Sequence, residues 1–277
     1  MPIHATMRVM SEPVCYITDF WTGAVDVEQA AMDGAARVVA LGAAHETELL
    51  YVRLNAHERW QHAIFMVCFT LLVITGFTLS LPDEWMRRVG ASALTRELRS
   101  LVHRVSGLAM IGVSIAHVTY LLFFREGRTW LRDIFPRPRD LRDLRENMAF
   151  YLGKRPAPPA FDRFTYAQKI EYWALIAGNT LMSATGLILM FEYMWGQMTL
   201  EVAALVHRME ATLACLAIIV WHLYEVHLKP GKFPHSFLWF HGLMTEDEMR
   251  EEHPEYCERL AKSPQERARR VILRGKE

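Results

Sequence analysis

The chain has 277 residues, of which 52% are apolar and 22% are charged. Its 31 Lys and Arg residues balance its 31 Asp and Glu residues, which argues against a nucleic-acid-binding protein, because such proteins carry a basic excess. Cys15, Cys68, Cys215 and Cys257 lie far apart, so the sequence has neither a disulfide framework nor a paired-cysteine metal or cofactor-attachment motif.

Four stretches are long and apolar enough to cross a bilayer, which takes about 20 residues in a helix. The first contains no charged residue, the second contains only Arg104, and the third has Glu171 at its edge. The fourth contains Arg208, Glu210 and Glu225, which we expect to lie near its ends and to reach the membrane interface. The predicted spans are about 60–81, 101–124, 170–192 and 203–228.

The basic residues predict how these spans are oriented. The loop 125–168 and the tail after Leu228 each carry ten Lys or Arg residues, whereas the turn between the last two spans carries none. The positive-inside rule therefore places this loop and both termini in the cytoplasm. We predict an all-α integral membrane protein: a four-helix transmembrane domain at 56–228, with cytoplasmic extensions at 1–55 and 229–277. Residues 1–50 lack the pattern of a signal peptide.

Histidines lie inside three of the four spans, and an ionisable residue within a membrane is a functional-site hypothesis by default. His62 lies in the first span, His103 and His117 in the second, and His207 and His222 in the fourth. His103 and His117 are 14 residues apart, which is about 21 Å of helical rise and close to four whole turns, whereas His207 and His222 are 15 apart, which is about 22 Å with a drift of roughly 60°. Spans two and four are therefore expected to present histidines at two matching depths.

A short internal repeat supports this match between the second and fourth spans. The tetrapeptide Leu-Val-His-Arg occurs at 101–104 and again at 205–208. Two imidazoles at equal depth on neighbouring helices can hold one haem iron from both sides, which leaves no open position and so favours electron transfer. Arg104 and Arg208 follow the first histidine of each pair and are predicted to contact haem propionates.

Alternative interpretations stay open at this point. A single intramembrane histidine often only bonds to a neighbouring helix. A non-redox transporter or membrane anchor would use the same histidines for protons or a metal ion. A self-contained quinol oxidase similar to cytochrome b561 would bind haem and need no partner subunit.

The sequence resembles the di-haem cytochrome b subunits of membrane-bound formate dehydrogenases and nickel–iron hydrogenases, from about Asn55 to Leu260. The resemblance lies in four motifs, one for each span: Arg59-Trp60-Gln61-His62, Leu101-Val102-His103-Arg104, Ala167-Gln168-Lys169 with Tyr172-Trp173, and His207 with Trp221-His222-Leu223-Tyr224. It implies haem b as cofactor, with an outer haem held by His103 and His207 and an inner haem held by His62 and His222.

The resemblance and the spacing agree on three ligands and differ on the fourth. Spacing alone nominates His117, and the resemblance nominates His62, which we favour. His117 is then a partner of a quinone or of a haem propionate, or the ligand of an additional haem, so the expected haem count is two or three. The resemblance also implies a menaquinone or ubiquinone site near the inner haem, at Thr165, Gln168 and Lys169.

The resulting functional prediction is a quinone-reactive, electron-transfer subunit of a respiratory oxidoreductase in the bacterial cytoplasmic membrane. It would move electrons between the quinone pool and a redox partner on the outer face, either a multihaem cytochrome or an iron–sulfur protein. The chain contains no flavin, nucleotide or iron–sulfur motif. It is therefore not expected to be catalytically complete alone.

Overall fold

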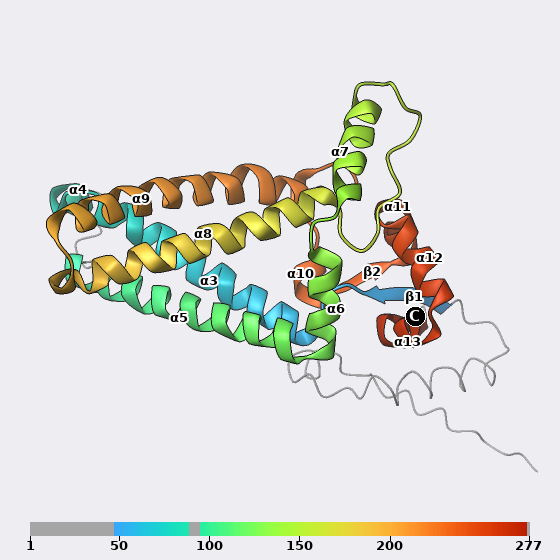
Figure 1. The fold of residues 1–277 in the computed structure, drawn as a ribbon, viewed down its shortest axis with the longest axis horizontal. Helices are drawn as coiled ribbons and strands as arrows, with labels where there is room; N and C mark the ends of the chain where they lie inside the picture. The colour runs from blue at the N-terminus through green and yellow to red at the C-terminus, as the bar shows by residue number, and fades with distance from the viewer. Residues whose placement is uncertain (1–46, 89–94, 276–277) are drawn as a thin grey trace, which may run out of the picture.

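Four long helices lie side by side and form an elongated bundle (Figure 1). The computed structural model describes residues 47–88 and 95–275. Helix α3 packs mainly against α5, and α8 packs mainly against α9. The bundle helices are α3 (Ala56–Leu79), α5 (Arg96–Phe123), α8 (Tyr166–Met190) and α9 (Gln197–Leu216).

The lengths and surfaces of these helices fit a lipid environment. All four, with α9 extended to Leu228, are long and apolar enough to cross a membrane. Val67, Ile115 and Leu213 expose 56%, 63% and 61% of their surfaces, which would be unfavourable in water but suits contact with acyl chains. The prediction of an integral membrane four-helix bundle is confirmed.

Capping residues set where the bundle helices begin. Asn55 accepts a bond from the backbone N–H of Glu58, and the Glu58 carboxylate accepts one from the backbone N–H of Asn55. Thr95 caps α5 through its hydroxyl oxygen. Such caps satisfy backbone donors that would otherwise be unpaired. Helices α3 and α5 therefore begin a turn earlier than the predicted apolar spans, at Ala56 and Arg96.

The fourth span changes its helical type partway along. After α9 it continues as two π-helical segments, η2 (Ala217–His222) and η3 (Tyr224–Leu228). A straight α-helix would carry His222 roughly 60° round from His207, because each residue turns the chain by about 100°. A π-turn holds more residues than an α-turn, so it reduces this drift. The π-helix therefore helps His222 to face the same side as His207.

One end of the bundle carries a small module, which we call the sheet end. Strand β1 (Thr47–Val52) lies between β2 (Leu243–Thr245) and β3 (Val271–Gly275), antiparallel to both. This sheet was not predicted from the sequence. Within residues 95–275 the module also contains six short helices: α6 (Arg125–Ile134), α7 (Pro138–Tyr151), α10 (Leu238–His241), α11 (Glu246–Glu252), α12 (Pro254–Lys262) and α13 (Pro264–Arg270).

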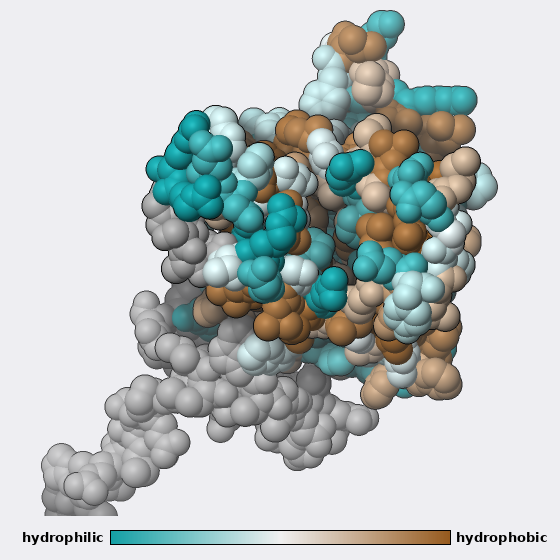
Figure 2. Space-filling view, turned by 90° about the vertical axis from the view of Figure 1, so that its left-hand side faces the viewer, coloured by the Kyte–Doolittle hydropathy of each residue, from teal (hydrophilic) through white to brown (hydrophobic). Residues whose placement is uncertain are grey.

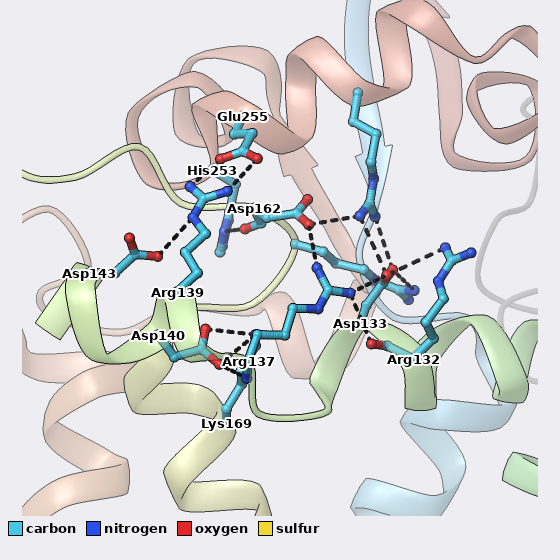
Figure 3. A network of polar contacts seen from close by, with 12 residues as sticks. Arg132, Asp133, Arg137, Arg139, Asp140, Asp143, Asp162, Lys169, His253 and Glu255 are labelled. Carbon is cyan, nitrogen blue, oxygen red and sulfur yellow. Dashed lines mark hydrogen bonds and ion pairs between the residues drawn. The ribbon is translucent and has the colours of Figure 1, made fainter.

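A core and an ionic network hold the sheet-end module together. Met244, Met249, Tyr256 and Leu260 are almost fully buried and form its apolar core. Beside them, the buried Asp133 carboxylate is surrounded by arginines from the 125–169 segment and from α12 (Figure 3). These arginines are Arg132, Arg137, Arg163 and Arg259. The network joins the predicted cytoplasmic loop to the C-terminal tail. The sequence had given no sign that these two segments contact each other.

The opposite end, which we call the turn end, consists of short connections. Helix α4 (Asp83–Arg88) lies in the connection from α3 to α5, and the 3-10 turn η1 (Glu192–Met194) lies between α8 and α9. Figure 2 looks onto this end, where hydrophilic side chains are spread among apolar ones. The 1–46 part of the predicted N-terminal extension lies outside the described residues.

Candidate haem-binding site

The structure brings the predicted outer histidines together near the turn end of the bundle. His103 of α5 and His207 of α9 have ring centres 6.3 Å apart, with the rings inclined at 69°. The repeated Leu-Val-His-Arg segments thus lie on two facing helices at equal depth.

The predicted inner histidines form a second pair toward the sheet end. His62 of α3 and His222 of η2 also have ring centres 6.3 Å apart, with an inclination of 38°. Both pairs combine one histidine from the α3–α5 half of the bundle with one from the α8–α9 half.

This separation fits two imidazoles that share one metal ion. An imidazole nitrogen binds a metal at about 2 Å, and the ring centre lies roughly 1 Å further out, so two rings on opposite sides of one ion are about 6 Å apart between centres. Among the described residues, no group of three or more His, Cys, Asp or Glu side chains could hold a metal ion. The donor sets are therefore histidine pairs, which suits a macrocycle that supplies the other ligands itself.

Two threonines orient the rings of the turn-end pair. The Thr75 hydroxyl donates to the carbonyl of Leu71, so its oxygen is free to accept the Nδ1–H of His103, 2.9 Å away. Thr185 makes the same contact with Nδ1 of His207, also at 2.9 Å. With the proton on Nδ1, Nε2 keeps its lone pair, which is what an iron ligand requires.

The sheet-end pair uses different chemistry. Nδ1 of His222 donates to the Glu171 carboxylate. A carboxylate bonded to a ligating histidine fixes the tautomer and raises the basicity of the other nitrogen. Nδ1 of His62 is buried and has no hydrogen-bond partner among the described residues.

Two glycines let neighbouring helices approach the turn-end rings. A Cβ atom on Gly76 would lie 3.2 Å from Cε1 of His103, and one on Gly186 would lie 3.4 Å from Cε1 of His207. The first distance is tighter than ordinary van der Waals contact and the second is at its lower limit, so a larger residue at either position would crowd the ring.

His117 lies apart from both pairs, with each of its ring nitrogens in a hydrogen bond. Nδ1 is 2.7 Å from the side-chain oxygen of Gln61, and Nε2 is 3.0 Å from the Tyr172 hydroxyl. Trp130 packs edge-on against its ring. These contacts leave His117 without a nitrogen for iron, so the geometry supports His62 over His117 as the fourth ligand.

The other predicted site residues occupy varied positions. Arg104 and Arg208 are exposed, one residue beyond the turn-end histidines. Thr165 and Gln168 form the capping box of α8, and the Lys169 ammonium donates to Asp140 at 2.8 and 3.0 Å (Figure 3). These are local structural roles, so propionate binding by the arginines and quinone binding by the other three stay predictions.

Comparison with known proteins agrees with this geometry. Residues 53–232 match the family model described as prokaryotic cytochrome b561, a segment that covers both histidine pairs. The chain belongs to this family. Over 220 residues it is 23% identical to the formate dehydrogenase cytochrome b556(fdo) subunit of Escherichia coli K12, covering 78% of this chain and 96% of that one. It is also 23% identical to the formate dehydrogenase cytochrome b556 subunit of Haemophilus influenzae, covering 62% of this chain and 69% of that one.

The family assignment confirms the resemblance that the motifs suggested. This prokaryotic cytochrome b561 family member is a b-type membrane cytochrome with a role in electron transfer. That assignment, together with the paired histidines, favours a cytochrome over the non-redox transporter or anchor that the sequence alone left open.

Thr75 and Thr185 were not predicted as site residues, although the sequence contains a pattern that marks them. Each precedes one of the two glycines, so a Thr-Gly dipeptide occurs at 75–76 and again at 185–186. Each dipeptide is followed, one helix later, by a Leu-Val-His-Arg repeat. The two repeats together form one recurring unit, in which a Thr-Gly pair on one bundle helix positions the histidine of the following bundle helix.

Proposed function

We propose that this chain holds two b haems and carries electrons through the membrane between them. His103 and His207 would hold one haem, and His62 and His222 the other. The observation that carries this proposal is the equal 6.3 Å ring separation in the two pairs. Bound haem supplies reversible one-electron chemistry, and ligation by two histidines keeps oxygen away from the iron.

The two ends of the bundle then face different partners. The sheet end gathers the basic loop and tail, so the positive-inside rule supports placing it in the cytoplasm. Its haem would exchange electrons with a quinone of the membrane pool. The turn-end haem would meet a redox subunit on the outer face, an iron–sulfur protein or a multihaem cytochrome. The named relatives, which are subunits of formate dehydrogenases, support such a partner.

A pyridine haemochrome assay on the purified full chain tests the haem count directly. We expect two b haems per polypeptide. Three would return His117 to a ligand role, and none would end the electron-transfer proposal. A gentle detergent extract tests the partner: copurification of another redox subunit supports it, whereas quinol oxidation by the chain alone, with no other subunit present, contradicts it.

A further inference from the structure

An acidic side chain lies in the middle of the bundle, between the two histidine pairs. Glu210 is on α9, one turn from His207 toward the sheet end. A methyl group on Gly178 would overlap the Glu210 carboxylate, so this carboxylate lies directly on the surface of α8. Gly178 is the central residue of α8, twelve residues from either end. The expectation that Glu210 reaches a membrane interface is therefore wrong.

The carboxylate has no compensating partner at this depth. It forms no hydrogen bond or ion pair with any of the described residues. Asn179, the residue after Gly178, donates instead to the hydroxyl of Ser114 on α5. His207 and Arg208 lie within one turn of Glu210 on its own helix, and Cys68 and Cys215 lie farther along the spans. The other titratable or charged groups of the four spans lie nearer the helix ends: His57, Glu58, Arg59 and His62 of α3, Arg96, Glu97, Arg99, His103, Arg104, His117 and Tyr120 of α5, Tyr166, Lys169, Glu171 and Tyr172 of α8, and Glu201, His222, Tyr224, Glu225 and His227 of the fourth span.

An isolated carboxylate in the hydrocarbon region is costly unless it is protonated or a positive charge lies near it. A haem held by two histidines provides such a positive charge in one of its oxidation states and not in the other. The ferric centre carries one net positive charge and the ferrous centre carries none, because the macrocycle contributes two negative charges and the imidazoles are neutral. In a low-dielectric interior, a change of one unit charge about a helical turn away strongly alters proton binding.

We propose that Glu210 is a redox-linked proton site for the turn-end haem. This inference rests on the proposed function, because it needs a haem on His103 and His207. When one electron from the partner subunit reduces the iron, one proton from water binds a Glu210 carboxylate oxygen. When the electron leaves toward the sheet end, that proton is released. The net charge inside the bundle then stays constant during turnover.

Redox titration of the purified full chain at several pH values tests this, with the turn-end haem identified as the one lost in His103→Ala. In the unchanged protein, its midpoint potential should fall as pH rises, by up to about 59 mV per pH unit, the value for one proton per electron. Glu210→Gln should raise the midpoint and remove most of this slope. Glu201→Gln is the matched control, because Glu201 lies on the same helix but is exposed and bonded to Gln197.

An infrared difference spectrum gives a second readout that needs no stable variant. Reduction should produce a carboxylic acid C=O band that shifts in heavy water, and Glu210→Gln should lack this band. A protein with two haems, a pH-independent midpoint and no such band would overturn the proton site alone. A protein without haem would overturn the proposed function instead. Equal slopes in Glu210→Gln and the unchanged protein would assign the proton to another group and reject Glu210.

Discussion

The two histidine pairs have the same ring separation but different surroundings. At the turn end, both rings are held by neutral threonine hydroxyls, and short connections close the bundle. At the sheet end, His222 bonds to the Glu171 carboxylate, His62 lacks a partner for Nδ1 among the described residues, and the folded module lies beyond the bundle. The rings of one pair thus make two matching hydrogen bonds to neutral hydroxyls, whereas in the other pair one ring bonds to a carboxylate and the other has no bond at Nδ1 to any residue that the structure describes.

This difference bears on the direction of electron flow. A carboxylate bonded to a ligand makes that imidazole a stronger donor and favours ferric iron. With other influences equal, Glu171 would lower the potential of the proposed sheet-end haem, whereas the threonines would add no charge beside the proposed turn-end haem. The negative charge of the proposed proton site at Glu210 would likewise lower the potential of the turn-end haem. The potentials of the two haems would then be more similar.

Replacing one histidine at a time should give the largest difference between the two histidine pairs. His103→Ala or His207→Ala should reduce the haem count from two to one by loss of the turn-end haem, and His62→Ala or His222→Ala should remove the other, because one strong ligand holds haem poorly. Haem per polypeptide and the number of potentiometric steps give the answer. His117→Ala is the matched control and should keep both haems. Loss of a haem in His117→Ala, with none lost in His62→Ala, would reverse the assignment.

Glu171→Gln should affect the sheet-end pair alone. The amide oxygen can still accept the Nδ1–H of His222, so the geometry is kept while the charge is lost. We expect haem affinity to fall by about tenfold and the midpoint potential to rise by about 60 mV. Haem transfer to an excess of an apo-globin and a redox titration measure the two effects. A shift confined to the turn-end haem would contradict the contact between Glu171 and His222.

Thr75→Val and Thr185→Val should each weaken the turn-end haem by a smaller and similar amount. Valine has the shape of threonine without the hydroxyl, so Nδ1 of the histidine loses its partner at a cost of about 1 kcal/mol, or roughly fivefold in haem affinity. The two single variants should give equal effects, because both contacts measure 2.9 Å. Thr180→Val, at an exposed position on α8, is the control. Unequal effects would show that the internal repeat is not a functional symmetry.

Acidification should destabilise the sheet end and leave the turn end unchanged. His253 is 1% exposed, donates from Nδ1 to the carbonyl of Asp162, and accepts from Arg53 at Nε2. Burial, with the adjacent Arg53 charge, holds the pKa of His253 well below its ordinary value, so the folded protein keeps this ring neutral. The unfolded chain binds a proton below about pH 6.5, so stability falls as pH drops through that value, by up to about 1.4 kcal/mol per pH unit.

Hydrogen exchange of β1 at pH 7.5 and 5.5 measures this loss. His253→Gln should reduce the difference between the two values, and His235→Gln, at an exposed position, should leave it unchanged. Equal protection of β1 at both pH values in the unchanged protein would show that His253 does not control stability at this end.

The spans were predictable because each depends on local composition, and a run of apolar residues such as 63–79 has no other stable environment than lipid. Helical spacing alone predicted that His103 and His207 lie at one depth, but it paired His222 with His117, and only the resemblance nominated His62. The spacing of residues in the sequence does not show where an α-helix changes to a π-helix, and this change turns His222 back toward the side that His207 faces. The sheet was not predictable, because β1 is six residues long and its partners lie about 200 residues away. Glu210 was misplaced because its sequence position does not show which neighbouring helix offers it space.

The position of β1 in its sheet also constrains how the protein is made. The ribosome synthesises this strand before the first span and both of its partner strands after the last. Leu50 can therefore pair with Thr245 and Ile272 only when nearly the whole chain has been made. Until then the strand has two open edges, which are ready to pair with the wrong chain. In the completed sheet, a strand from before the first span pairs with strands from after the last span at one end of the bundle. The chain between them must therefore run along the bundle an even number of times.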